Sequence, residues 1–261
     1  MTATQTLVLT RSTGRVLHLT LNRPEKRNAL NSELIYALTD AVDALAVNPR
    51  VSVVVLTGAG GTFSAGADVQ ELQGLDAERA RGFISRLHEL NNTVRNLPQV
   101  VIAAIEGHCL GGALELAAAC DVRIAAEGAQ FGMPEIRVGM PSVIEAALLL
   151  PLIGLGRTAD LVLTGETIDT AEARRVGLVT RVTPAGELEA AANELAARIA
   201  SFNPQALRLQ KALIRRWTEG AGIDDGIAAG ITTFVEAFRS PNPTEALTVF
   251  LEQRAPHFQG E

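Results

Sequence analysis

The sequence has few cysteines and no excess of positive charge, and both absences narrow its function. Only Cys109 and Cys120 occur in 261 residues, and both lie in apolar surroundings. Two buried thiols are typical of a reducing compartment and provide no disulfide framework. Lys and Arg number 23 against 29 Asp and Glu, which gives a net charge of −6. Because no basic stripe is available to displace counterions from phosphates, nucleic acid is not expected as a partner.

Several familiar binding and anchoring signals are also missing. The glycine-rich stretch 57–68 is neither GxGxxG nor a P-loop, which argues against a dinucleotide or a nucleoside triphosphate. Ser64 does not stand in a G-x-S-x-G motif, because position 62 is threonine, so a serine nucleophile is not supported. We find no leader-like apolar region and no apolar run that approaches a membrane span. We therefore expect a cytoplasmic protein without a membrane partner.

Apolar residues, in contrast, are abundant. They make up 47% of the chain against 20% charged residues, which predicts a packed globular core. Continuous apolar runs at 51–56 and 100–105 predict strands covered on both faces, with helices between them. On the residues alone this pattern predicts a doubly wound α/β sheet. The other predicted strands are 5–9, 15–21, 121–125 and 177–182, and the predicted helices are 34–47, 77–97, 113–120, 143–152, 160–166, 170–176, 188–200, 204–217, 223–238 and 243–253.

The end of the chain is predicted to be entirely helical from about residue 195. Its glycines and prolines fall between the helices, as connectors do. Amphipathic helices at the end of an α/β chain cover their own core or dock on a partner subunit, and we expect both.

The stretch from Gly107 to Glu135 carries the clearest chemical signal. Gly111 and Gly112 separate an apolar strand from a helix rich in Ala and Leu, and Glu115 lies in the first turn of that helix. The helix N-terminus can hold a developing negative charge, and glycine lets a ligand approach the backbone. A carboxylate one turn away can then move a proton. The alternative is a tightly packed strand-turn-helix, in which an unpaired glutamate among Ala, Leu and Cys would be unusual.

Two further features stay open on the residues alone. The loop 22–28 (NRPEKRN) contains three cations, which suit a phosphate but equally a solvated turn. Glu145 lies in the apolar stretch VIEAALLL, where it is either an accessory acid or one half of an ion pair.

Taken together, these motifs resemble the crotonase, or enoyl-CoA hydratase/isomerase, superfamily. The similarity covers nearly the whole chain and rests on several motifs in a fixed order. They are NRPEKRNALN at 22–31, GTFSAGADVQEL at 61–72, IEGHCLGGALELAAACDVRIA at 105–125, AQFGMPEI at 129–136, LTGETIDTAEARRVGLVTRV at 163–182 and FLEQRAPHF at 250–258.

The resemblance implies an α/β fold of a different kind from the doubly wound sheet. The expected core is a spiral of stacked ββα turns over residues 1–195, which holds coenzyme A and the active site. The expected C-terminal helical region, residues 196–261, serves to form a homotrimer, or a hexamer made of two trimers.

The activity implied is the reversible hydration of a 2-enoyl-CoA thioester to a 3-hydroxyacyl-CoA in lipid metabolism. By position, the backbone N–H groups of Ala67 and Gly112 form an oxyanion hole for the thioester oxygen as it becomes an enolate. Glu115 and Glu135 hold a water over Cβ. Glu115 acts as base toward that water, and Glu135 delivers or removes the proton at Cα. No metal and no cofactor other than the coenzyme A of the substrate are implied.

The resemblance also places the coenzyme A. Lys26 and Arg27 are expected near its phosphates, which favours the phosphate interpretation of the charged loop. Backbone contacts to coenzyme A are implied for Ala65, Gly66, Ala67, Asp68, Val69, Gly111 and Gly112.

The chain departs from the family pattern in two places. Gln253, followed by Arg254, stands where hydratases commonly carry a lysine that reaches a neighbour's coenzyme A. The usual P-G-x-G-G turn, which shapes the acyl pocket, is replaced by PSVIEA at 141–146. An enoyl-CoA isomerase, another acyl-CoA dehydratase and a non-catalytic acyl-CoA-binding homologue therefore remain alternatives.

Overall fold

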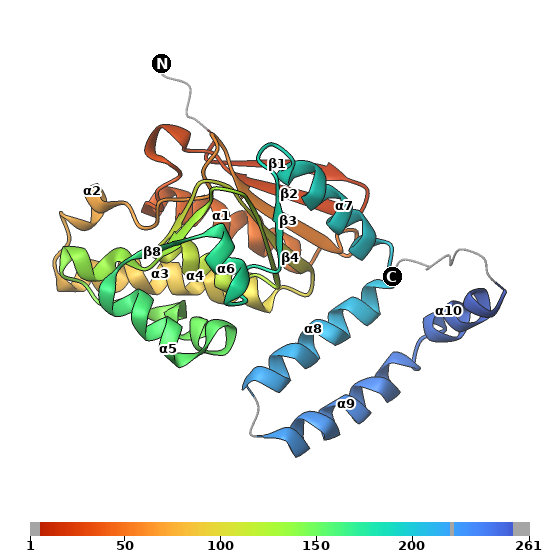
Figure 1. Cartoon of the computed structure of the whole chain (residues 1–261). Helices are drawn as coiled ribbons and strands as arrows, with labels where there is room; N and C mark the ends of the chain where they lie inside the picture. The colour runs from red at the N-terminus through yellow and green to blue at the C-terminus, as the bar shows by residue number, and fades with distance from the viewer. Residues whose placement is uncertain (1–5, 220–221, 253–261) are drawn as a thin grey trace.

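The computed structural model describes residues 6–219 and 222–252 (Figure 1). Nine strands in this part of the chain form two sheets, one in the order β1-β2-β3-β4-β6-β9 and one in the order β5-β7-β8. The strands are β1 (Val8–Thr13), β2 (Val16–Leu21), β3 (Val53–Gly58), β4 (Val100–Ile105), β5 (His108–Leu110), β6 (Val122–Ala126), β7 (Gln130–Gly132), β8 (Thr167–Asp169) and β9 (Arg181–Thr183). The α-helices are α1 (Ser32–Ala46), α2 (Val69–Leu72), α3 (Ala77–Asn96), α4 (Gly112–Ala119), α5 (Leu149–Thr164), α6 (Thr170–Arg175), α7 (Leu188–Ala200), α8 (Pro204–Glu219), α9 (Ile223–Ala237) and α10 (Asn242–Leu251), and the 3-10 turns are η1 (Pro24–Lys26), η2 (Pro134–Val138) and η3 (Ile144–Leu148).

The order of the strands distinguishes a spiral from a doubly wound sheet. Strands β2, β3, β4, β6 and β9 run parallel and lie side by side in chain order. A doubly wound sheet would reverse its strand order at a switch point. After β4 and after β6 the chain adds one short strand to the second sheet, where β5 and β7 are parallel neighbours. The α/β spiral is thus confirmed, and the doubly wound sheet predicted from the residues alone was wrong.

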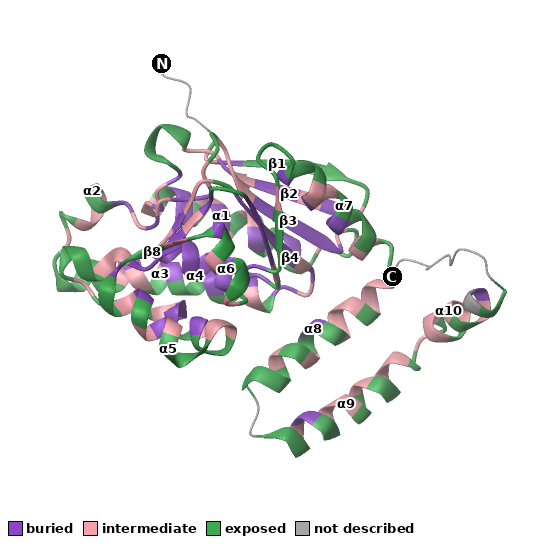
Figure 2. Cartoon of the chain, viewed as in Figure 1, coloured by how far each residue is buried: buried purple, intermediate pink, exposed green. Residues whose placement is uncertain are grey.

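The core lies on both faces of the larger sheet. On one face α1, α3 and α4 cover the sheet, and Leu34, Ile35, Leu38, Val42 and Leu45 of α1 are buried at the helical spacing that the sequence predicted. Asn31 caps this helix, because its side chain accepts the Leu34 N–H at 3.0 Å. On the other face α7 packs on β3, β4 and β6. Figure 2 shows the buried residues concentrated between these layers. The boundary predicted after residue 195 falls inside α7.

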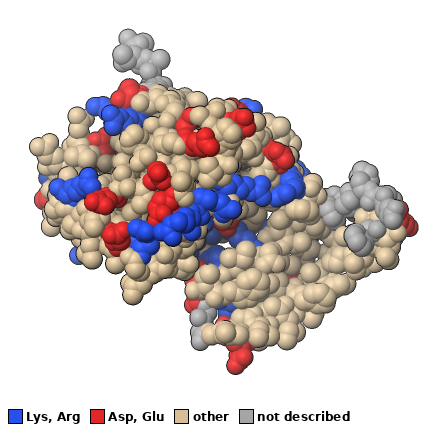
Figure 3. Space-filling model, in the orientation of Figure 1, with Lys and Arg blue, Asp and Glu red and all other residues tan. Residues whose placement is uncertain are grey.

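Helices α8, α9 and α10 form an arm that extends from the core (Figure 1). Lys211 of α8 ties the arm to the core, because its Nζ lies 2.8 Å from Asp121 Oδ2 and donates to the Gln99 carbonyl at 2.9 Å. Helix α9 leaves an apolar stripe exposed, and the visible surface of the arm carries few charges (Figure 3). The stripe consists of Ile223, Ile227, Ile231, Phe234 and Phe238, which recur at helical spacing.

The segment between the site and the arm differs from the prediction. Instead of two helices at 143–152 and 160–166, the chain forms η3 and then α5, which is kinked where Gly154 adopts φ 77° and ψ 161°. By length and composition, residues 144–164 also reach what a membrane-spanning helix needs, contrary to the expectation that no run does. This segment is not one continuous helix, and it carries the buried Glu145 and the ion-paired Arg157. Leu149 and Leu161 of α5 are buried, whereas Leu155 and Leu163 are exposed.

Candidate active site

Gly111 and Gly112 form the turn between β5 and α4. Gly111 has φ 53° and ψ −127°, a conformation open to glycine but strained for other residues, and its N–H is held by the Gly132 carbonyl at 2.8 Å. A Cβ added at Gly111 would overlap Glu135 Oε1. Only a hydrogen at this position therefore lets the carboxylate of Glu135 approach the helix N-terminus.

The backbone N–H groups of Ala67 and Gly112 lie near each other. A Cβ at Gly112 would be 3.9 Å from the Ala67 nitrogen. Gly112 is the first residue of α4, so its N–H has no partner within the helix. In the described part of the chain, neither N–H donates to another group. The two donors and the helix dipole can act on one oxygen, as an oxyanion hole requires.

Glu115 is a buried carboxylate one turn into α4. It is 3% exposed, and its Oε1 accepts the Ala146 N–H at 2.9 Å. Burial raises the pKa of Glu115 to about 8; the Ala146 N–H opposes this rise, and the charges of Glu135 and Glu145 add to it. None of the described residues donates to Oε2.

Glu135 approaches from the other side, on the turn η2. Its Oε2 accepts a hydrogen bond from Ser142 Oγ at 2.9 Å, and its Oε1 lies against Gly111. Each carboxylate therefore has one oxygen bound to the protein and one without a donor among the described residues. Two free carboxylate oxygens beside an oxyanion hole can hold and deprotonate one water.

These groups open into one pocket of about 510 Å³. Its lining includes Ala67, Gly112, Glu115 and Glu135, so the structure brings together the four residues predicted as catalytic. The rest of the wall is mostly apolar, and its members include Leu72, Phe83, Ile84, Leu87, Met140, Pro141 and Val143. A pocket of this kind suits a hydrocarbon chain.

The predicted coenzyme A stretch lies beside this pocket. Gly66 has φ 91°, and its carbonyl accepts the Leu30 N–H at 2.8 Å, which joins the stretch 65–69 to the charged loop. Asp68 is buried, caps α2 and pairs with Arg23 at 2.5 Å. Although its partial burial acts in the opposite direction, the hydrogen bond from Arg23 helps to hold the pKa of Asp68 below its usual value. Arg23 therefore serves the fold. Ala65 is half-buried and Val69 is exposed.

Lys26 and Arg27 remain available at the surface. Both are exposed, and Lys26 Nζ lies 3.1 Å from Gln70 Oε1. Arg27 and Asn28 have positive φ, which turns the loop back so that Asn28 can donate to the Ala59 and Thr62 carbonyls. The second predicted contact region, Gln253 and Arg254, lies outside the described residues.

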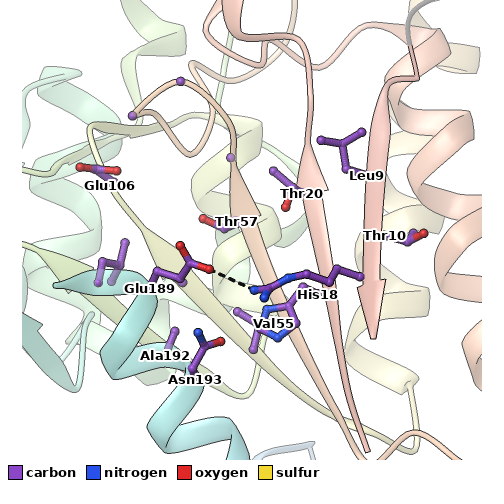
Figure 4. A pocket seen from close by; sticks show the side chains of 16 residues that line it. Leu9, Thr10, His18, Thr20, Val55, Thr57, Glu106, Glu189, Ala192 and Asn193 are labelled. Atoms are coloured by element: carbon purple, nitrogen blue, oxygen red, sulfur yellow. Dashed lines mark hydrogen bonds and ion pairs between the residues drawn. The ribbon is translucent and has the colours of Figure 1, made fainter. Parts of the chain in front are cut away.

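A second pocket, of about 460 Å³, lies on the opposite face of the sheet (Figure 4). It is lined by residues of β1, β2, β3 and α7, and the ion pair between Arg11 and Glu189 spans it at 3.0 Å. His18 is buried here and pairs with Arg11 across β1 and β2. None of the predicted site residues lines this pocket.

Three site residues were missed from the sequence. Ser142 binds Glu135, while His88 and Asn91 of α3 bind Glu145. Ser142 lies in segment 141–146, where the sequence differs from the usual P-G-x-G-G turn of the family. That difference was the only sequence feature that pointed to this residue. His88 is an exposed residue that reaches Glu145 from the surface of α3. Its three-residue spacing from Asn91 was visible, but nothing local to α3 indicates Glu145, which lies more than 50 positions away.

Comparisons with known proteins agree with this geometry. Residues 11–261 match the family model described as enoyl-CoA hydratase/isomerase. The chain is 37% identical over 252 residues to a probable enoyl-CoA hydratase of Mycobacterium bovis, covering 96% of this chain and 97% of the relative. It is 35% identical over 249 residues to a short-chain-enoyl-CoA hydratase of Clostridium acetobutylicum, covering 95% of each. The crystal structure of an enoyl-CoA hydratase from Bacillus anthracis superimposes with a TM-score of 0.93 at 36% identity, covering 98% of this chain and 100% of that one.

Proposed function

Because this chain belongs to the enoyl-CoA hydratase/isomerase family, we propose that it catalyses the reversible hydration of a 2-enoyl-CoA thioester to a 3-hydroxyacyl-CoA. The observation that carries the proposal is the pair Glu115 and Glu135, each with one free carboxylate oxygen, in the same pocket as the Ala67 and Gly112 N–H groups. An isomerase needs to move only a proton, whereas hydration needs a water held between a base and an acid.

The first step proposed is attack of water on Cβ. Glu115 and Glu135 hold the water, and Glu115 takes its proton as the C–O bond forms. Electrons move through the conjugated system to the thioester oxygen, which becomes an enolate bound by the N–H groups of Ala67 and Gly112. The raised pKa of Glu115, about 8, suits this role, because a base is most effective when its pKa lies near the operating pH.

The second step is protonation of Cα. Glu135, which is protonated when the substrate binds, delivers its proton to Cα as the enolate collapses to the thioester. The proton that Glu115 took from water then passes to Glu135, which restores the starting pair. The hydrogen bond from Ser142 Oγ and the lack of a side chain at Gly111 fix the position of the Glu135 carboxyl group. In the reverse direction, Glu135 removes the Cα proton, and Glu115 protonates the departing hydroxyl.

The substrate is proposed to lie along loop 65–69 with its acyl chain in the apolar pocket. Backbone groups of residues 65–69 would hold the adenine and pantetheine, and Lys26 and Arg27 would pair with the phosphates. Phe83, Ile84 and Leu87 give this pocket apolar surface for a hydrocarbon acyl chain, and Arg81 places one cation in the same lining.

The arm is proposed to join copies of this chain into a homotrimer, alone or as two stacked trimers. The support is the exposed apolar stripe of α9, in which Ile231 and Phe234 are each 66% exposed. Removing such a stripe from water is the usual driving force for association.

The test is a hydration assay with crotonyl-CoA, followed by loss of the conjugated thioester absorbance. The wild type should consume crotonyl-CoA, and Glu115→Gln and Glu135→Gln should each lower kcat by about 10²–10⁴-fold, since each removes a proton-transfer group. Both substitutions keep the shape of the side chain and its described hydrogen-bond acceptor, so folding is preserved.

Three results would contradict the proposal in different ways. Near-normal hydration in Glu135→Gln would refute its assigned role. Exchange of the Cα proton with solvent, without net hydration, would indicate an isomerase. Tight binding of acyl-CoA without turnover of short, medium or polar enoyl chains would indicate a binding protein.

A further inference from the structure

Glu145 is a third carboxylate beside the proposed catalytic pair, and two side chains of α3 bind it. It is 4% exposed, its Oε1 lies 2.7 Å from His88 Nδ1, and its Oε2 accepts from Asn91 Nδ2 at 3.0 Å. His88 and Asn91 are three residues apart, so they project from the same face of α3. A carboxylate this deeply buried requires such partners. Asn91 is itself fully buried, and its amide nitrogen donates its hydrogen bond to Glu145.

The turn that carries Glu145 also binds Glu115. Ala146, the next residue, donates its N–H to Glu115 Oε1 at 2.9 Å. This turn starts at Ile144, which has φ 42°, a left-handed conformation that β-branched residues rarely adopt, and no side chain caps the turn. A strained backbone persists only where its surroundings hold it in place. The two bonds from α3 to Glu145 contribute to that hold, immediately beside the Ala146 N–H, which is shared between Glu115 Oε1 and the Val143 carbonyl at 3.0 Å.

The charged groups around Glu115 are few. Helix α4 has no other titratable residue, η2 contributes Glu135 and carries Arg137, whose side chain lies near Gly165, and η3 contributes Glu145. Helix α3 contributes Arg81, which lines the same pocket as Glu115, and His88, which binds Glu145. On α5, Arg157 and Asp160 pair with each other, and Arg157 pairs with Glu172. Strand β5 carries His108 and the buried Cys109, whose thiol donates to the Ala113 carbonyl. Glu145 is thus one of two negative charges that act on Glu115.

We propose that Glu145, held by His88 and Asn91, is a positioning residue for Glu115: it keeps the Ala146 N–H on Glu115 Oε1 and places a negative charge beside that carboxylate. The inference rests on the proposed function insofar as Glu115 is the catalytic base. It assigns a role to the segment 141–146, in which this chain departs from the glycine-rich turn of its family. Glu145 itself does not line the acyl pocket, so its effect is on the base and not on the acyl group.

The first experiment titrates Glu115 directly and needs no substrate. The infrared band of its protonated carboxyl group is identified by its loss in Glu115→Gln and is then followed against pH in Glu145→Gln. The amide of Glu145→Gln preserves the shape of the side chain and can bond to both α3 partners while it removes the charge. The titration midpoint of Glu115 should move to lower pH, because a neighbouring negative charge is lost. The pH dependence of kcat for crotonyl-CoA should shift in the same direction, with KM within about twofold of wild type.

The matched control is Glu89→Gln, which removes one charge from an exposed α3 residue next to His88. It should leave the Glu115 midpoint and the pH profile unchanged. A folded Glu145→Gln whose midpoint equals that of the wild type would overturn the inference. Because the infrared titration does not depend on turnover, a wild type without hydratase activity would refute the proposed function and still leave this inference tested.

A second pair of variants covers the case in which Glu145→Gln fails to fold. His88 is 51% exposed, so its replacement is tolerated more easily. His88→Ala should lower kcat about threefold to tenfold with KM unchanged, the range expected for one lost hydrogen bond. His88→Asn, whose amide nitrogen can occupy the position of Nδ1, should restore most of that loss. Equal kcat in His88→Ala and wild type, or no rescue by His88→Asn, would contradict the positioning role.

Discussion

The core and the arm of this protein handle their apolar residues in opposite ways. In the core, α1 buries five apolar side chains, and α4 is buried along its whole length. In the arm, α9 has only Gly226 buried and exposes five large apolar residues along one stripe. Figure 2 shows the contrast between the two regions. The apolar residues of the core are buried within one chain, whereas the stripe of α9 stays exposed in the single chain and fits the proposed contact with another copy.

This contrast suggests a division of labour. All four proposed catalytic residues and the pocket belong to the core. The arm is tied to the core chiefly by Lys211, with Asp121 and the Gln99 carbonyl, and by the ion pair between Arg95 and Glu219. Substitutions in the core are therefore expected to change the hydration rate without changing the native mass of the assembly. Substitutions in the stripe are expected to change the native mass without changing the chemistry of the site.

The largest expected effect is that of Gly111→Ala. The added Cβ would overlap Glu135 Oε1, and the positive φ would strain the turn, so Glu135 must move away from the helix N-terminus. Displacement of a catalytic group by about 1 Å lowers rates by about 10²-fold, and we expect at least that loss of hydration. Native mass should be unchanged. Gly128→Ala, a surface glycine with positive φ and open space around it, controls for backbone strain alone. Dissociation of the Gly111→Ala oligomer into monomers would contradict the proposed separation, in which the core determines activity and the arm determines assembly.

The converse substitution is Ile231→Asp in the stripe of α9. A charge placed in an apolar interface is expensive to bury, so native mass should fall from the trimer or hexamer to the monomer. Light scattering after size-exclusion chromatography measures this change. Thr232→Asp adds the same charge at the neighbouring exposed position, outside the stripe, and should keep the wild-type mass. A wild type that is monomeric at assay concentrations would contradict the assembly proposal.

Within the core, Glu115 should destabilise the fold that holds it. Its pKa is about 8 in the folded protein, against an ordinary value of 4.5 for an exposed glutamate. Between those values the unfolded chain has lost a proton that the folded protein keeps, so the free energy of unfolding falls as pH rises, by about 1.4 kcal/mol per pH unit at most. Glu115→Gln avoids this loss of stability and should be more stable than wild type by about 4 kcal/mol at pH 8, with little difference near pH 4. Denaturant unfolding at both pH values measures it. Glu127→Gln, on the surface, should show no such gain, and equal stability of Glu115→Gln and wild type at pH 8 would mean that burial does not penalise this carboxylate.

The smallest expected effect is that of Ser142→Ala. Its hydroxyl holds Glu135 Oε2, but water can replace it at this half-buried position. Loss of one hydrogen bond corresponds to about 0.5–1.5 kcal/mol, so kcat should fall about twofold to tenfold with KM and mass unchanged. Ser142→Thr, which keeps the hydroxyl, is the control. A fall in kcat as large as that of Glu135→Gln would contradict a purely supporting role and would indicate that Ser142 takes a direct part in proton transfer.

Much of the site was predictable because its signals are local. Gly111, Gly112 and Glu115 share one turn, and the chemistry of a helix N-terminus beside a carboxylate can be inferred from that spacing. Likewise, the buried face of α1 and its Asn31 cap follow from periodicity and capping rules. The kink of α5 was missed, because a single glycine in an apolar run signals a helix break only weakly.

The sequence by itself determined most of the longer helices and strands, the apolar core and, through motifs in a fixed order, the family, but not the short strands β5, β7 and β8. The tertiary structure decided how distant residues meet: strands that follow one another in a spiral, Ser142 on Glu135, and the α3 residues His88 and Asn91 on Glu145. It also decided that Arg23 serves Asp68, whereas Lys26 and Arg27 stay exposed. The physical reason is the range of the forces involved. Propensity, capping and periodicity act over a few neighbouring residues, but hydrogen bonds and burial act between any groups that the fold brings within a few ångströms, and their sequence separation leaves no local trace.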